Sequence, residues 1–193
     1  GLRGVRGDLR VEDTYFESPG WHPSWGTTSS RAYHAPIGAL TANYGTFYVS
    51  ILPGAGVGSQ AYVAVDPPVD YLRLRNRAKT AGGGARPRLS VDRAQGKRSE
   101  GPADEVVQVE GVVRVGDDLD GLPRSVLDPG LYAGSLLAYQ LKANGVFLGG
   151  DVKRGPREGR DWTLLMDRKG RRIAGAVEPF IKYCNNSVAG TLF

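Results

Sequence analysis

The sequence predicts an α+β fold that is rich in β-structure, built on a small antiparallel sheet with a C-terminal helix and an irregular N-terminal arm. The chain of 193 residues contains 28 glycines and 12 prolines. Set beside short runs of Val and Tyr, these residues favour short strands joined by turns. Near the C-terminus, apolar residues recur at helical spacing over residues 173–184, which indicates one helix with an apolar face. A chain of this length is sufficient for one main core.

The chain divides into four expected segments. These are an extended arm at residues 1–30, a β-hairpin region at 31–78, a basic Gly-rich linker at 79–102 and a core at 103–193. The arm is rich in Gly, Pro, Ser and Trp without periodicity, and the linker has almost no apolar residues.

Strands are expected where β-branched and aromatic residues alternate or cluster between turn signals. The expected strands are 45–51, 61–65, 69–74, 105–115, 135–141 and 145–148, with a last hairpin of 162–166 and 171–174. The first two strands are expected to pair as a hairpin, and residues 117–128 form an acidic loop. We expect the C-terminal helix to begin near Glu178, because Pro179 is tolerated in a first turn but is costly inside a helix.

Cysteine and histidine are too few for most of the sites that need them. Cys184 is the only cysteine, which excludes an intramolecular disulfide and favours a reducing compartment. Adding His22 and His34 does not supply a structural zinc site, so we expect no metal and no cofactor. Nucleophilic catalysis needs a base, and both histidines lie in or beside the irregular arm, while Cys184 lies on the apolar face of the expected helix. We therefore expect a protein that is not an enzyme.

The ends of the chain suggest processing. The chain begins at Gly1 and its single methionine is Met166, so we expect release from a larger precursor. The sequence has no signal-peptide pattern, and no apolar run approaches the ~20 residues of a transmembrane helix. Ordinary secretion and membrane insertion are therefore not expected.

Positive charge is concentrated in two blocks, although the net charge is only +5. The first block covers residues 73–98. The second forms a hypothetical binding surface that consists of Lys153, Arg154, Arg157, Arg160, Arg168, Lys169, Arg171 and Arg172. Such blocks bind nucleic acid, anionic lipid or an import receptor, or they are solvated loops of a basic protein, and the sequence leaves both interpretations open.

A short receptor motif occurs in the arm. Arg6, Gly7 and Asp8 form the integrin-recognition tripeptide, in a segment that is expected to be exposed. Chance occurrence in an arm rich in Arg and Gly is the simpler explanation.

Two stretches of the C-terminal part resemble the boxes of a known family. Residues 134–151 read GSLLAYQLKANGVFLGGD, which resembles the H-box of the lecithin:retinol acyltransferase group, and residues 176–184 read AVEPFIKYC, which is similar to its NC box. The resemblance places Ala143 at the catalytic histidine, Val177 at the nucleophilic cysteine and Pro179 at a second histidine. It implies a papain-like scaffold that has lost its nucleophile and its base.

Picornaviruses of the kobuvirus and parechovirus type encode H-box/NC proteins at the 2A position, directly after the capsid region. The resemblance therefore implies a catalytically inactive viral non-structural protein, released from a polyprotein. Such a protein acts as a monomer or dimer by binding host proteins in the host cytoplasm or nucleus. One alternative is a picornavirus-like capsid segment with an Arg-Gly-Asp receptor loop. Another is a basic RNA-binding module, with RNA as the partner of the basic blocks.

Overall fold

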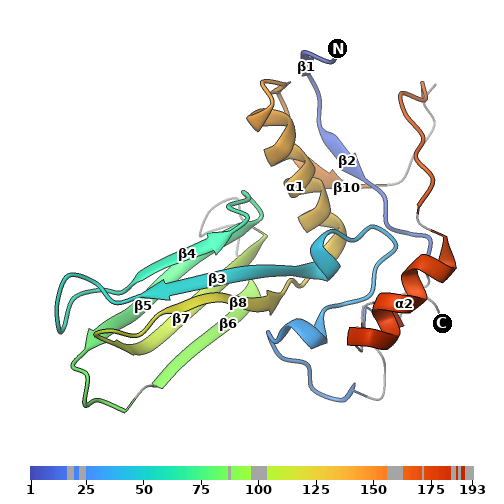
Figure 1. The fold of residues 1–193 in the computed structure, drawn as a ribbon. Helices are drawn as coiled ribbons and strands as arrows, with labels where there is room; N and C mark the ends of the chain where they lie inside the picture. Colours follow the sequence, from blue (N-terminus) through green and yellow to red (C-terminus); the bar gives the residue numbers. More distant parts are fainter. Residues whose placement is uncertain are drawn as a thin grey trace.

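In a computed structural model, the middle of the chain, residues 46–125, forms two three-stranded sheets (Figure 1). The structure describes residues 1–16, 20–21, 25–86, 88–96, 104–155, 163–170, 172–183, 186 and 188–189. Both sheets contribute to one hydrophobic cluster, which lies between their inner faces. The cluster includes Phe47, Val49, Ile51, Ala78, Val91, Val107, Val109 and Val113, each 6% exposed or less. The α+β, β-rich fold class is therefore confirmed.

The first sheet has the order β4-β3-β8 and is antiparallel. Its central strand β3 (Thr46–Leu52) pairs with β4 (Tyr62–Asp66), which confirms the predicted hairpin. On its other side β3 pairs with β8 (Leu119–Ser125). Strand β8 occupies most of the segment that was expected to be an acidic loop, because Leu119 and Leu122 pack against the core despite the acidic residues between them.

The second sheet has the order β5-β7-β6 and is mixed. Strand β7 (Glu105–Arg114) lies between β5 (Leu72–Ala81), which runs parallel to it, and β6 (Arg88–Gln95), which runs antiparallel. The expectation of one small antiparallel sheet is therefore wrong. Strand β6 also falls where a linker was expected, since Leu89 and Val91 are sufficient to pack on the core.

A third unit lies at one end of the sheets and is built around helix α1 (Pro129–Ala143). Strands β2 (Leu9–Val11) and β10 (Val152–Arg154) pair in parallel beside it, as do the short strands β1 (Gly4–Val5) and β9 (Phe147–Leu148). The 3-10 helices η2 (Ala32–His34) and η3 (Asn43–Gly45) lie between β2 and β3 along the chain. The expected extended arm thus includes two strands.

Helix α1 replaces the strand that was expected at residues 135–141. Asp128 caps its N-terminus and Pro129 starts it, an arrangement typical of helix N-termini. Gly134 allows close packing, because a Cβ there would lie 2.5 Å from Cγ1 of Val11 and 2.7 Å from Cγ1 of Val152. The helix can therefore lie directly against β2 and β10.

Helix α2 (Ile173–Tyr183) lies apart from the sheets near the C-terminus (Figure 1). It begins before the expected start at Glu178, so that the backbone of Pro179 lies inside the helix. Ile173 and Ala174 therefore lie in a helix and not in the expected hairpin strand, whereas Trp162 and Arg171 lie outside the described residues. None of the helices in the described ranges is long and apolar enough to cross a membrane.

Candidate functional site

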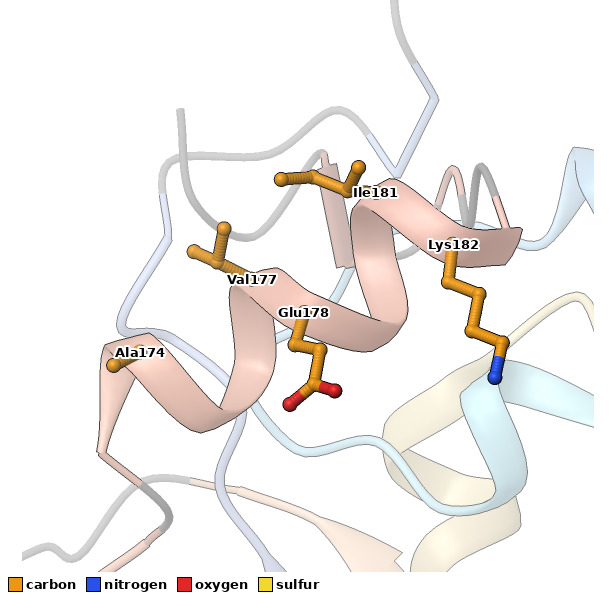
Figure 2. Close-up of a pocket in the computed structure, with 5 residues that line it drawn as sticks. All are labelled: Ala174, Val177, Glu178, Ile181 and Lys182. Carbon is orange, nitrogen blue, oxygen red and sulfur yellow. The ribbon is translucent and has the colours of Figure 1, made fainter.

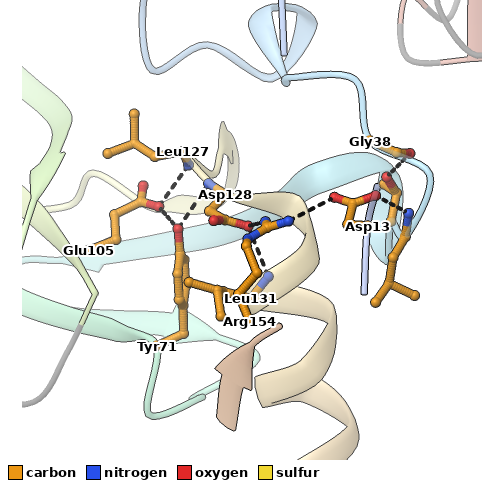
Figure 3. Close-up of polar contacts among 10 residues, drawn as sticks. Asp13, Gly38, Tyr71, Glu105, Leu127, Asp128, Leu131 and Arg154 are labelled. Carbon is orange, nitrogen blue, oxygen red and sulfur yellow. Dashed lines mark hydrogen bonds and ion pairs between the residues drawn. The ribbon is translucent and has the colours of Figure 1, made fainter. Parts of the chain in front are cut away.

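A buried carboxylate lies where the sheets meet the α1 unit. Glu105, the first residue of β7, is 0% exposed. Its Oε2 accepts hydrogen bonds from the Tyr71 hydroxyl at 2.8 Å and from the Leu127 backbone N–H at 2.7 Å (Figure 3). Burial raises the pKa of Glu105 to about 7, although these hydrogen bonds and the nearby Arg93 oppose the shift. Burial also raises the pKa of Tyr71.

The network continues from the sheets into the α1 unit through Asp128. The Asp128 N–H donates to the Tyr71 hydroxyl at 3.0 Å, and the Asp128 carboxylate accepts from the Leu131 N–H at 2.9 Å. The same carboxylate accepts from Nη2 of Arg154 at 2.5 Å, and Nη1 of Arg154 lies 3.8 Å from Asp13 (Figure 3). These contacts join the starts of β5, β7 and α1 with β10 and the segment after β2.

Arg93 connects the network to the N-terminal part of the chain. Its guanidinium donates to the Val126 carbonyl and, at 3.0 Å, to the Ser29 carbonyl. It also lies over the Trp21 ring, 5.9 Å from the centroid. Burial lowers the pKa of Arg93 while the charge of Glu105 opposes this shift. The positive charge of the half-buried Arg93 and the ionised form of the buried Glu105 therefore stabilise one another.

This network can hold segments together but is not arranged for catalysis. Glu105 Oε1 has no hydrogen-bond partner among the described residues, and neither Glu105 nor Tyr71 reaches the surface. Within the described ranges, no group of three or more His, Cys, Asp or Glu side chains could hold a metal ion. Sequence reasoning missed Glu105 and Asp128. The Asp-Pro pair at 128–129 was the available signal, because it marks a helix start.

One serine–histidine contact is present at the surface. Ser29 Oγ lies 2.9 Å from Nδ1 of His34, and the Ser29 N–H donates to the same nitrogen at 2.9 Å. Trp21 Nε1 donates to the His34 carbonyl at 2.7 Å. The His34 ring therefore closes a local loop by accepting a backbone N–H. A catalytic base needs a third group that orients it, and no described carboxylate is recorded on His34.

The residues at the degenerate box positions do not form a papain-like site. Ala143 is the last residue of α1 and is exposed, whereas the H-box requires a strand there. Val177 and Pro179 lie on α2. His22 and Cys184 lie outside the described residues.

A shallow surface on α2 is lined by Ala174, Val177, Glu178, Ile181 and Lys182. Figure 2 shows Val177 and Ile181 pointing to one side of the helix, and Glu178 and Lys182 to another. Ile181 is 70% exposed. Three of the five lining residues are apolar, which suits a contact surface. These five residues include no Ser, Cys or His that could act as a nucleophile or base, and no set of metal ligands.

The predicted basic surface is divided by the structure. Lys153 pairs with Asp8 at 2.8 Å, and Arg154 pairs with Asp128. Arg168, Lys169 and Arg172 are exposed, whereas Arg157, Arg160 and Arg171 lie outside the described residues. The two cations on β10 therefore hold the α1 unit together.

The Arg-Gly-Asp tripeptide is tied to the α1 unit. Asp8 accepts from Lys153 Nζ and from the Asp151 N–H at 3.1 Å, and these hydrogen bonds hold the pKa of Asp8 below its usual value. A Cβ on Gly150 would lie 2.7 Å from the Asp8 nitrogen, which shows how closely the two segments approach. The Asp8 carboxylate is therefore engaged within the chain.

Comparisons with known proteins identify relatives along the whole chain. The model of the D-Ala-D-Ala carboxypeptidase 3 (S13) family matches residues 1–193. A D-alanyl-D-alanine carboxypeptidase of Actinomadura sp. (strain R39) is 33% identical over 205 residues, which cover 100% of this chain and 36% of that protein. The chain thus spans about a third of the length of this curated relative.

Solved structures show the same fold. Penicillin-binding protein 4 from Haemophilus influenzae matches 98% of this chain and 40% of its own, with a TM-score of 0.70 and 19% identity. The same protein complexed with a novel beta-lactam gives a TM-score of 0.63 and 17% identity over 98% of this chain and 37% of that chain.

These matches contradict the viral assignment. The resemblance to picornavirus H-box/NC proteins is wrong, because a bacterial peptidase family covers the entire chain and α1 lies where the H-box strand was expected. The inactive viral protein, its capsid and RNA-binding alternatives, and the host cytoplasm or nucleus as its location are therefore wrong as well. The expectation that the protein is not an enzyme is also wrong, since its family is a peptidase family. The chain belongs to the D-Ala-D-Ala carboxypeptidase 3 (S13) family.

Proposed function

We propose that this chain is a structural part of a bacterial D-alanyl-D-alanine carboxypeptidase of the penicillin-binding class. The family match over residues 1–193 carries the proposal. The complete protein would hydrolyse the last peptide bond of a peptide that ends in D-Ala-D-Ala and release D-alanine. The chain would pack against the region of the complete protein that carries the catalytic serine and would stabilise the conformation of that region.

The sequence supports this division of roles. Penicillin-binding proteins use a serine nucleophile in a Ser-x-x-Lys motif, together with Ser-Asp-Asn and Lys-Thr-Gly motifs. The 193 residues contain neither Ser-x-x-Lys nor Lys-Thr-Gly, and Cys184-Asn185-Asn186 keeps only the last residue of Ser-Asp-Asn. The curated relative is much longer, so the nucleophile has ample room in the 64% of that protein that this chain does not match (100% − 36%).

The C-terminal segment supports a contact with further protein. Leu164, Leu165 and Met166 are 77–85% exposed, and Ile173 and Ile181 on α2 are each 70% exposed. Several large apolar side chains exposed along one segment are typical of a contact with further protein. The remainder of a full-length carboxypeptidase would cover these side chains.

A chimera tests the proposal. The matching region of the Actinomadura carboxypeptidase is replaced by residues 1–193, and release of D-alanine and covalent labelling by a fluorescent penicillin are measured. We expect the chimera to be labelled and active, and the isolated chain to be neither. A second chimera, in which alanine replaces the serine of the Ser-x-x-Lys motif, serves as the inactive control.

Two results would contradict the proposal. The first is labelling or D-alanine release by the isolated chain, which would place the nucleophile within it. The second is a chimera that folds, as judged by circular dichroism and a cooperative melting transition, but has no activity.

A further inference from the structure

Helix α1 ends in a C-cap that depends on glycine. Asn144 is the C-cap residue, and Gly145 follows it in the left-handed region with a φ of 76°. The Gly145 N–H donates to the Lys142 carbonyl at 3.0 Å. The Val146 N–H donates to the Leu141 carbonyl at 2.9 Å. These two hydrogen bonds form the Schellman motif, in which glycine is preferred because a Cβ is unfavourable at positive φ. The cap therefore places a glycine directly after an asparagine.

An Asn-Gly sequence is chemically labile. The backbone nitrogen of the glycine can attack the asparagine Cγ, because no side chain on the glycine shields this nitrogen. An N–Cγ bond forms, the Cγ–Nδ2 bond breaks, and the amino group leaves as ammonia with the proton of the backbone amide. Water then opens the succinimide ring and leaves either aspartate or isoaspartate. Asn144-Gly145 is the only Asn-Gly pair in the 193 residues.

Solvent reaches both residues of this pair. Asn144 and Gly145 are exposed, and a Cβ built on Gly145 would have no atom of a distant residue within 4 Å. Water, the only co-reactant, is therefore available at the reacting atoms.

Two hydrogen bonds oppose the reaction while the cap is closed. The attacking nitrogen of Gly145 donates to the Lys142 carbonyl, and the leaving Nδ2 of Asn144 donates to the Gln140 carbonyl at 2.8 Å. Both acceptors belong to the last turn of α1. The pair can therefore react only when this turn opens.

The last turn of α1 is able to open locally. Helix ends fray, and the free energy of such an opening is far below that of global unfolding. Lys142 and Ala143 are exposed, so they add little packing to this turn. Lys142 Nζ pairs with Asp70 at 3.0 Å, but these side chains are 52% and 89% exposed, so solvent screens the attraction. Fraying therefore determines how often the Asn-Gly pair is free to react.

We propose that Asn144 is a site of spontaneous deamidation, gated by fraying of the last turn of α1. The closed cap protects the pair, and each opening frees the Gly145 nitrogen and the Asn144 amide to react with one another. The reaction uses only these two residues and water. It is therefore independent of the proposed carboxypeptidase role.

Deamidation at Asn144 weakens the connection between α1 and β9. Aspartate places a negative charge at the C-terminus of the helix, where the macrodipole is already negative. Isoaspartate adds one carbon atom to the main chain and displaces Gly145 from the cap. Strand β9 begins two residues later, where the Phe147 N–H donates to the Arg3 carbonyl at 3.1 Å, beside β1 (Figure 1). The pairing of β1 with β9 should therefore loosen in the modified chain.

The test follows the chain of residues 1–193 in mildly alkaline buffer by peptide mapping and mass spectrometry, which detect the replacement of the side-chain NH2 by OH. Asn76 is the internal reference. Its amide donates to the Ala61 carbonyl at 2.7 Å and accepts from the Ala78 N–H at 2.9 Å, and the next residue, Arg77, carries a side chain. We expect conversion of Asn144 before conversion of Asn76 is detected.

The variant Ala143→Gly tests the gating. Glycine is less favourable than alanine in a helix by an amount that corresponds to roughly fivefold in the opening equilibrium, so Asn144 should deamidate roughly fivefold faster. The matched control Ala64→Gly makes the same change at an exposed position of β4 and should leave the rate unchanged. In urea, where the cap is absent, the parent chain and A143G should react at one rate, which exceeds that of the folded parent.

Three results would overturn the proposal. The first is an Asn144 that stays intact as long as Asn76 in the folded parent chain. The second is a rate in folded A143G no higher than that of the parent. The third is an equal acceleration in A143G and A64G, which would mean that global unfolding and not fraying of α1 limits the reaction.

Discussion

Apolar side chains are buried in the two sheets but exposed in the C-terminal segment, residues 163–183 as far as the structure describes them. Phe47, Val107 and Tyr132 of the body formed by the sheets and α1 are 0% exposed, whereas Leu165 and Ile181 near the C-terminus are 85% and 70% exposed. The body therefore derives its stability from its own core. The C-terminal segment gains little from the parts of the chain that the structure describes, and its stability would come from contacts with further protein.

The largest expected effect is at Tyr132, where α1 meets the core. Its ring is fully buried and packs edge-on against Tyr71 with centroids 6.0 Å apart, and its hydroxyl donates to the Thr46 carbonyl at 3.0 Å. Tyr132→Ala should lower the free energy of unfolding by about 3–5 kcal/mol, because it leaves a cavity. Tyr132→Phe loses only the hydrogen bond and should cost about 1 kcal/mol. Urea unfolding measures both, and equal costs would contradict the role of the ring.

The next effect concerns pH and the buried Glu105. Its pKa is about 7 in the folded protein against a usual value of 4.5, so between these pH values the folded state holds a proton that the unfolded chain has released. The free energy of unfolding therefore decreases as the pH rises from 4.5 to 7, by on the order of 3 kcal/mol from this group. The side chain of Glu105→Gln has no proton to lose, so this variant should not show the decrease. Its amide carbonyl can still accept hydrogen bonds from Tyr71 and Leu127.

Urea unfolding of the parent chain and of Glu105→Gln at pH 5 and pH 8 checks this prediction. Asp8 contributes with the opposite sign, because its lowered pKa gives stability that is lost as the pH falls. Asp8 is present in both proteins, so its contribution cancels in the difference. Equal pH dependence of the two proteins would show that Glu105 does not titrate in this range.

The strands of the body could be predicted from sequence where alternation was clear. Strands β3, β4 and β7 lie within one residue of their expected bounds, because apolar residues alternate or run without interruption there. Strand β6 was missed, since its few apolar residues are separated by Arg, Asp and Ser and become informative only beside β7. Helix α1 was misread as a strand. Its Leu, Ala and Tyr residues suit either structure, and only the Asp-Pro pair at 128–129 marks the helix start.

The candidate site could not be predicted, because its contacts come from distant parts of the chain. Glu105 and Tyr71 are 34 residues apart, and only the parallel pairing of β5 and β7 brings them together. The wrong family resemblance also arose because local sequence does not report the three-dimensional context. Short boxes around residues 143 and 177 matched a pattern locally, but the first box is helical up to Ala143 in the structure.

A smaller effect is expected at the junction between the body and α1. Asp128→Ala removes the N-cap contact with the Leu131 N–H and the pair with Arg154, and should cost about 1–2 kcal/mol of stability. Asp118→Ala is the control, because Asp118 is exposed in the turn before β8. It should change the unfolding free energy by less than about 0.5 kcal/mol. A cost at Asp128 no larger than that at Asp118 would show that the network does not stabilise the junction.

The smallest effect within this chain is expected at Ile181 on α2. Because this side chain is 70% exposed, Ile181→Ser should change the stability of residues 1–193 by less than about 0.5 kcal/mol. In the Actinomadura chimera the same change should lower the melting temperature and the activity, because there the remaining protein would cover the apolar face of α2. Lys169→Ser, at another exposed position, should leave both proteins unchanged. Differential scanning fluorimetry on the four variants decides the matter. Equal effects of Ile181→Ser in the isolated chain and in the chimera would mean that α2 gains no partner in the longer protein, and the contrast between the body and the C-terminal segment would then have another origin.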